Sequence, residues 1–70
     1  MAQVSQNYLE GIREARALRK LIDDSVVVRI AEAEIKFCDD AEYWAGSGLH
    51  KDFIQGQRDF WVNQLKLAGE

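Results

Sequence analysis

The chain has 70 residues, of which 47% are hydrophobic and 30% charged, with a formal net charge of −3 and a single cysteine. This composition is typical of one small globular domain, and it excludes a disordered chain and a disulfide scaffold. The sequence contains no apolar run of the roughly 20 residues that span a membrane, and it begins without the basic-then-apolar order of a signal peptide. We therefore expect a single domain over residues 1–70, located in the cytoplasm and neither inserted in a membrane nor exported.

The first predicted element is a helix over residues 5–22. Asn7 followed by Glu10 has the form of a capping box at its beginning. Arg13, Arg16 and Lys20 form a basic stripe, which we interpret as a solvated face, with phosphate or partner binding as the alternative. The apolar face of this amphipathic helix has six residues: Val4, Tyr8, Ile12, Ala15, Leu18 and Ile22.

In the second element, residues 25–45, helix and strand compete. Four β-branched residues at positions 26, 27, 28 and 30 favour a strand. The following AEAE consists of strong helix formers, and residues 31–34 offer no turn former that would close a hairpin. Helical spacing of the apolar residues continues up to the break at Gly46, Ser47 and Gly48, so we predict a helix. Its predicted apolar face is Ile30, Ala33, Phe37, Ala41 and Trp44.

The third predicted helix, residues 48–68, has an apolar arc around roughly half of its circumference, wider than the about 100° that packing on one neighbour needs. Gly56 lies at the edge of this arc, and Gly11 has a corresponding place on the first helix. Each glycine costs about 1 kcal/mol relative to alanine, which indicates that the two permit a close approach of backbones. The arc consists of Leu49, Phe53, Ile54, Phe60, Trp61, Leu65, Leu67 and Ala68.

These elements predict an all-α fold of three helices, in which the second and third helices form an antiparallel hairpin. A chain of this size has a small core, and oligomerisation is a common remedy. Because the arcs of the second and third helices exceed what one intramolecular contact covers, we also expect a homodimer. The residues expected at the interface between its subunits are Phe37, Trp44, Ile54, Trp61 and Leu65.

The sequence predicts no catalytic, metal or cofactor site. Cys38 and His50 do not match a zinc-binding spacing, and Cys38 falls on an apolar side of its helix, where an inert thiol is usual. The sequence contains no GxGxxG, P-loop or HExxH motif. We therefore expect a protein that is not an enzyme and that binds no metal and no cofactor.

Charge and one aromatic side chain at the end of the second helix indicate a binding surface. Asp39, Asp40 and Glu42 crowd its last turns, where the helix dipole disfavours negative charge. Tyr43 is expected to be exposed beside them, as in an interface hot spot; a solubilising acidic end is the alternative. We hypothesise that these four residues bind a larger protein partner, with a second patch formed by the arginines of the first helix, Arg13 and Arg16.

The segment YLEGIREARALRKLI resembles the first helix of the small head-tail joining proteins of tailed phages. The resemblance covers that helix alone. It implies a β-rich middle segment, which disagrees with the helix that we predict there. It favours a small accessory protein of a phage or mobile element, a class in which short chains bind and inhibit or sequester a larger host protein. A structural head-tail joining component and a weak nucleic-acid-binding regulator are the alternatives.

Overall fold

The computed structural model describes residues 5–45 and 48–69, with the side chains of residues 5–40 and 51–69. These residues form α1 (Gln6–Leu21), the short 3-10 helix η1 (Asp24–Val26), α2 (Val27–Ala45) and α3 (Gly48–Leu67). The predicted all-α fold is therefore confirmed for the described residues, including the segment in which a strand was the alternative. No described helix has the length and apolar character that a membrane-spanning segment requires.

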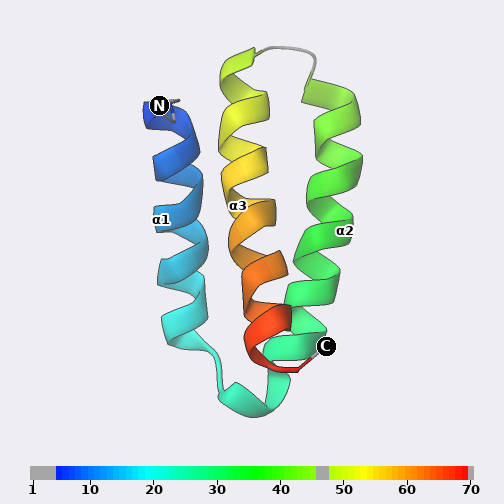
Figure 1. Ribbon diagram of the computed structural model, residues 1–70. Coiled ribbons are helices and arrows are strands. Elements are labelled where there is room, and N and C mark those ends of the chain that lie inside the picture. The colour runs from blue at the N-terminus through cyan, green and yellow to red at the C-terminus, as the bar shows by residue number, and fades with distance from the viewer. Residues whose placement is uncertain (1–4, 46–47, 70) are drawn as a thin grey trace.

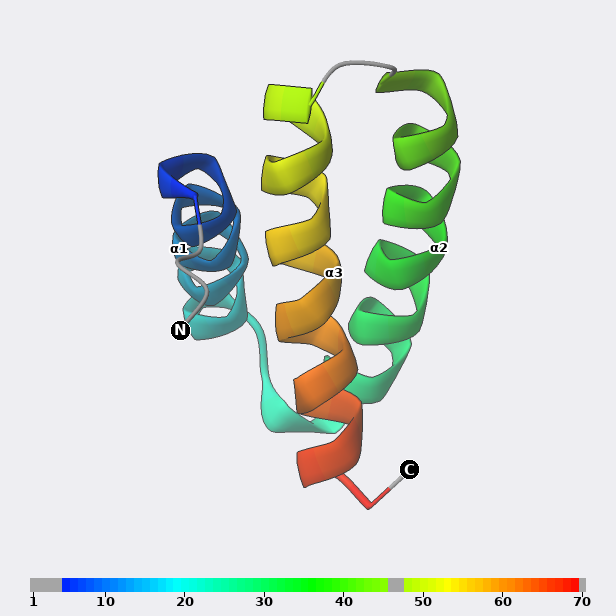
Figure 2. The same cartoon turned by 45° about the horizontal axis from the view of Figure 1, so that its top comes forward.

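Helix α3 lies between the other two helices in both views of the ribbon (Figures 1 and 2). Figure 1 shows that α1 and α3 run in the same direction and that α2 runs in the opposite one, so α2 and α3 form the predicted antiparallel hairpin. The central helix contacts both neighbours. This position accounts for most of the wide apolar arc of α3, because two helices cover it rather than one. Leu67 and Ala68, at the end of the predicted arc, are exposed.

The start of α1 agrees with the predicted bound at residue 5, but the residue that caps it is not Asn7. The Ser5 hydroxyl accepts a hydrogen bond from the backbone N–H of Tyr8 at 3.1 Å, so Ser5 is the N-cap. The predicted capping box of Asn7 and Glu10 is therefore wrong. Serine is as good a cap as asparagine and comes first in the chain, and Glu10 instead accepts a hydrogen bond from the side chain of Gln6 at 3.2 Å.

The core is formed around Trp61 of α3, whose side chain is 1% exposed. Trp61 packs with Ala15 of α1 and Ala31 of α2, so that each helix contributes one residue to the buried cluster. The alanines leave space for the indole between the two outer helices. The ring of Phe60 packs edge-on against Trp61, with 5.2 Å between the ring centroids.

The backbones of α1 and α3 meet at two glycines. A Cβ atom on Gly11 would overlap the carbonyl oxygen of Phe53, and one on Gly56 would overlap the carbonyl oxygen of Tyr8. The same Cβ atoms would lie 3.1 Å from the backbone nitrogen of Gln57 and 3.2 Å from that of Ile12. The close backbone approach predicted from the sequence is therefore confirmed, because neither position has room for a side chain.

Helix α2 packs on α3 with a face other than the predicted one. Val27, Ala31 and Cys38 are buried, whereas Ala33 is exposed and the Phe37 side chain is 67% exposed. Trp61 already fills the space between the helices, so the small side chains of α2 fit there and Phe37 does not. Of the predicted face, Ile30 packs against the core, and the side chains of Ala41 and Trp44 lie outside the described residues.

Candidate functional site

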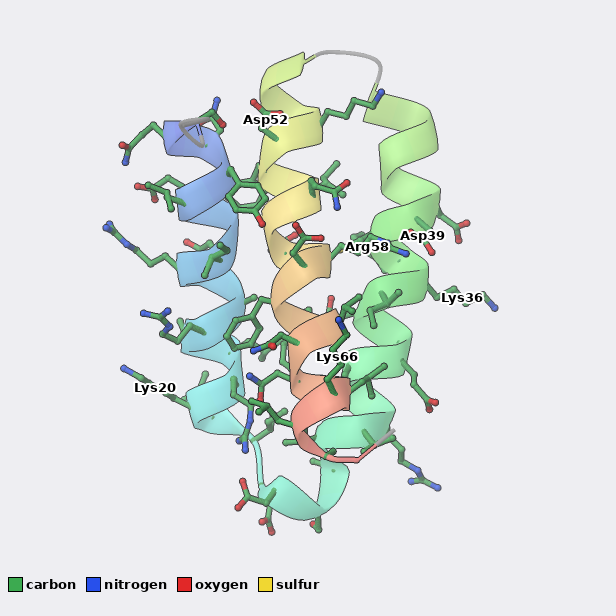
Figure 3. The ribbon with its side chains drawn as sticks, viewed as in Figure 1. Lys20, Lys36, Asp39, Asp52, Arg58 and Lys66 are labelled. Atoms are coloured by element: carbon green, nitrogen blue, oxygen red, sulfur yellow. The ribbon has the colours of Figure 1, made fainter. Side chains whose placement is uncertain are left out.

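An apolar strip on α2 faces away from α3. It consists of Ala33 and Phe37, and we call it the outer stripe of α2. At 100° per residue, these two positions lie about 100° to 140° around the helix from the buried face of α2, too far for α3 to cover them. Figure 3 shows the side chain of the neighbouring Lys36 pointing away from the bundle.

The surface at the outer stripe is hollowed. Ala33, Glu34 and Phe37 line an open hollow of about 360 Å³. Arg29, Lys36 and Asp40 are exposed beside it, and Glu34 is half-buried. An apolar centre with a charged rim is the usual composition of a protein-protein interface.

The residues of the predicted acidic patch at the end of α2 differ in their contacts. Arg58 of α3 donates a hydrogen bond from its Nε to Asp39 Oδ1 at 2.6 Å, which joins α2 to α3 (Figure 3). Asp39 and Asp40 are both exposed, but Asp39 has a role within the chain through its pairing with Arg58. The side chains of Glu42 and Tyr43 lie outside the described residues, so their place in a partner surface stays a prediction.

The outer face of α1 is basic. Arg13 and Arg16 are exposed, and Lys20 points away from the bundle on the same helix (Figure 3). Glu10 lies 3.6 Å from the Arg13 guanidinium and offsets part of its charge. Because α3 lies between α1 and α2, the helices that carry the basic face and the outer stripe are at opposite edges of the molecule (Figure 1).

The residues predicted for the subunit interface have different positions in the fold. Phe37 is exposed, Ile54 and Leu65 are half-buried, and Trp61 is buried within the single chain. Trp61 therefore has no surface to offer a second copy, because the indole is already covered by α1 and α2. The side chain of Trp44 lies outside the described residues.

Two exposed groups were missed by the sequence analysis. Leu21 at the end of α1 is 82% exposed, and its position, roughly 115° around the helical wheel from the centre of the apolar face, was a usable signal. Arg29 is exposed on α2 on the side of the outer stripe. Arg29 is four residues from Ala33 and eight from Phe37, so it lies on the same side of the helix as they do. Its exposure would therefore follow from the sequence once the buried face of α2 is known.

A polar cluster joins α1 to α3. The Tyr8 hydroxyl donates a hydrogen bond to Asp59 Oδ2 at 2.5 Å, and Gln55 Nε2 donates one to Asp59 Oδ1 at 2.8 Å. The hydrogen bond to Asp59 raises the pKa of Tyr8, and burial and the negative charge of Asp59 raise it further. Both carboxylate oxygens thus accept a hydrogen bond within the chain, and we interpret the cluster as a structural link.

Among the residues that the structure describes, no three His, Cys, Asp or Glu side chains are grouped so that they could hold a metal ion. The Cys38 thiol is buried in the contact between α2 and α3, as the sequence predicted. Comparison with protein-family models, with curated proteins and with solved structures gave no match. We therefore infer the function from the two exposed faces, the outer stripe of α2 and the basic face of α1.

Proposed function

We propose that this chain is a small non-enzymatic protein-interaction module, which forms a homodimer through the outer stripe of α2 and binds a larger protein. The observation that carries the proposal is the exposure of Phe37, at 67%, beside the exposed Ala33. Burial of a phenylalanine side chain stabilises a complex by about 1.5–3 kcal/mol. Aromatic residues within a charged rim are enriched among the residues that dominate binding energy.

The exposed area of the chain supports the same proposal. Its accessible surface is 5180 Å² for a mass of 8.0 kDa, whereas a folded monomer of that mass is expected to expose about 4500 Å². The excess, about 700 Å², is close to the ~800 Å² that each partner buries in a standard interface. One further protein contact would bring the buried area to that of an ordinary folded protein.

The basic face of α1 is the surface that we assign to the larger partner. Arg13 and Arg16 are exposed there, and a dimer formed through α2 leaves both copies of this face accessible. Its charge suits an acidic protein surface. Asp40, Glu42 and Tyr43 at the end of α2 would add a second contact, with Asp39 held by Arg58.

The role that we favour is inhibition or sequestration of a larger host protein by an accessory protein of a phage or mobile element. A dimer with two outward basic faces can cover an extended acidic surface, and two linked sites bind more tightly than one. The helical α2 argues against a head-tail joining component, whose resemblance implied a β-rich middle segment. The basic face also suits phosphates, so a nucleic-acid-binding regulator is the second candidate.

Light scattering on the purified chain tests the dimer. We expect twice the chain mass of 8.0 kDa for the wild type and the monomer mass for Phe37→Asp, because a buried unpaired carboxylate opposes association. Leu21→Asp is the matched control, since Leu21 is also apolar and is more exposed than Phe37 but lies on α1. A wild type of 8.0 kDa at micromolar concentration would refute the dimer.

Calorimetry tests the larger partner. Proteins retained by the immobilised chain from nuclease-treated host lysate are identified and purified, and their binding to the wild type, Arg16→Glu and Lys66→Glu is measured. We expect Arg16→Glu to weaken binding about tenfold and Lys66→Glu, an exposed change on α3, to leave it unchanged. Equal affinity in all three would show that α1 does not bind the partner. If instead the chain retains only nucleic acid from untreated lysate, with steep salt dependence, the second candidate is established.

A further inference from the structure

We propose that the second copy packs antiparallel on α2, with Phe37 of each chain seated over Ala33 of the other. The inference rests on the proposed homodimer and specifies its geometry. A twofold axis that passes between positions 33 and 37 brings the two outer stripes face to face. The subunit contact is then isologous, as in most soluble dimers.

The sizes of the two side chains favour the antiparallel arrangement. Ala33 and Phe37 are one helical turn apart on the same side of α2, and the hollow of about 360 Å³ lies between them and Glu34. In the antiparallel dimer each large ring enters the hollow beside a small residue, twice in one interface. A parallel dimer at equal register would place Phe37 against Phe37 and Ala33 against Ala33, which leaves a void at the alanine level.

Two charged residues on one flank of the outer stripe, Arg29 and Asp40, are complementary in the same register, whereas the two copies of Lys36 on that flank approach each other near the twofold axis. Arg29 and Asp40 are both exposed on this flank. The axis that pairs position 33 with 37 brings Arg29 within one residue, about 1.5 Å along the helix, of the level of Asp40 of the second copy. Within one chain these residues are separated by about 16 Å along the helix, at 1.5 Å per residue, so they cannot pair with each other. The antiparallel dimer therefore gains two symmetric ion pairs.

Glu34 makes the opposite contribution. It lies on the other flank of Phe37 and is half-buried, and the two copies of Glu34 approach each other near the twofold axis. Like charges at such a distance weaken association. The register therefore predicts that Glu34→Gln tightens the dimer, by about twofold.

Asp40 has a different role in the antiparallel dimer from the one expected from the sequence. In the partner surface expected from the sequence, Asp40 contacts the larger protein together with Asp39 and Glu42. In the antiparallel dimer its carboxylate faces Arg29 of the second copy, and Asp39 is held by Arg58 of its own chain. The acidic end of α2 then contributes mainly to contacts within and between the two chains of the dimer. The basic face of α1 is the principal surface for the larger partner.

Charge exchange tests the register by analytical ultracentrifugation of the full chain, with circular dichroism to verify that each variant is folded. Arg29→Asp and Asp40→Arg should each weaken the dimer about tenfold, because two attractive contacts become repulsive. The double variant Arg29→Asp/Asp40→Arg restores both pairs with reversed sign, and its affinity should return to within about twofold of the wild type. Glu14→Lys, on the exposed side of α1, is the control and should have no effect.

The outcomes separate the register from the dimer itself. A monomeric wild type would overturn both the proposed homodimer and this inference. If the wild type is a dimer and the Phe37→Asp variant is also a dimer, the chain forms a homodimer but not through α2. Loss of the dimer in Phe37→Asp, together with single charge variants as tight as the wild type or a double variant as weak as the singles, would overturn the antiparallel register alone.

Discussion

The two contacts of α3 are built on different principles. Its contact with α1 brings backbones together at Gly11 and Gly56, where an added Cβ would overlap a carbonyl oxygen. Its contact with α2 is made by small buried side chains, Ala31 and Cys38, beside the large Trp61. The contact between α1 and α3 depends on the absence of side chains at two positions. The contact between α2 and α3 depends on apolar side chains that fill the space between the helices. Substitutions that add or remove atoms should therefore distinguish the two contacts.

Trp61→Ala should have the largest effect, because the indole packs against both outer helices. Removal of a fully buried aromatic side chain costs about 3–5 kcal/mol, which is comparable with the whole stability of a small domain. We expect the variant to lack a cooperative urea transition at 25 °C. Leu67→Ala, at a residue 74% exposed on the same helix, is the control, and equal stability of the two variants would contradict the core assignment.

Gly11→Ala and Gly56→Ala should come next, with a loss of about 1–3 kcal/mol each from overpacking of the contact between α1 and α3. The sign is diagnostic, since alanine at an unconstrained helical position stabilises by up to about 1 kcal/mol over glycine. Urea unfolding at neutral pH measures the change. Neutral or stabilised glycine variants would mean that the backbones are not in contact, and Asn63→Ala on the exposed side of α3 shows the response of an uncrowded position.

The sequence was sufficient for the contact between α1 and α3 but not for the contact between α2 and α3. Glycine destabilises a helix relative to alanine, so the presence of Gly11 and Gly56 indicated that the backbones of α1 and α3 come close. On α2 the predicted face contains Phe37, whereas the buried face consists of the smaller residues Val27, Ala31 and Cys38. The helix packs with the smaller face because Trp61 occupies the space between α2 and α3. The apolar pattern of one helix does not show how much space the side chains of its neighbour take up.

Polar links between helices were also beyond the sequence. The hydrogen bond from Tyr8 to Asp59 and the ion pair of Arg58 with Asp39 join residues that are 51 and 19 positions apart. Each depends on the register of two helices, which hydrophobic periodicity fixes only to within about a turn. Arg19 is a similar case, because its hydrogen bond to Gln64 at 3.2 Å follows from the parallel alignment of α1 with α3.

Tyr8→Phe should have the smallest effect of the three and a particular pH dependence. The substitution removes the hydrogen bond to Asp59 between α1 and α3 and should cost about 1 kcal/mol at neutral pH, as is typical of a part-buried hydrogen bond. The pKa of Tyr8 is raised in the folded state from its ordinary value of 10.0, first by that hydrogen bond and then by burial and the charge of Asp59. Folding therefore favours the neutral hydroxyl.

A raised pKa in the folded state means that the stabilisation is complete below pH 10 and is lost as the pH rises through the folded value. The difference in unfolding free energy between the wild type and Tyr8→Phe should accordingly be constant from pH 7 to about 9.5 and shrink above it. Tyr43 is present in both proteins, so its titration cancels in the difference. Urea unfolding across this range measures the effect, and a difference that stays constant or grows above pH 10 would show that Asp59 does not hold the Tyr8 proton, leaving the glycines as the main link between α1 and α3.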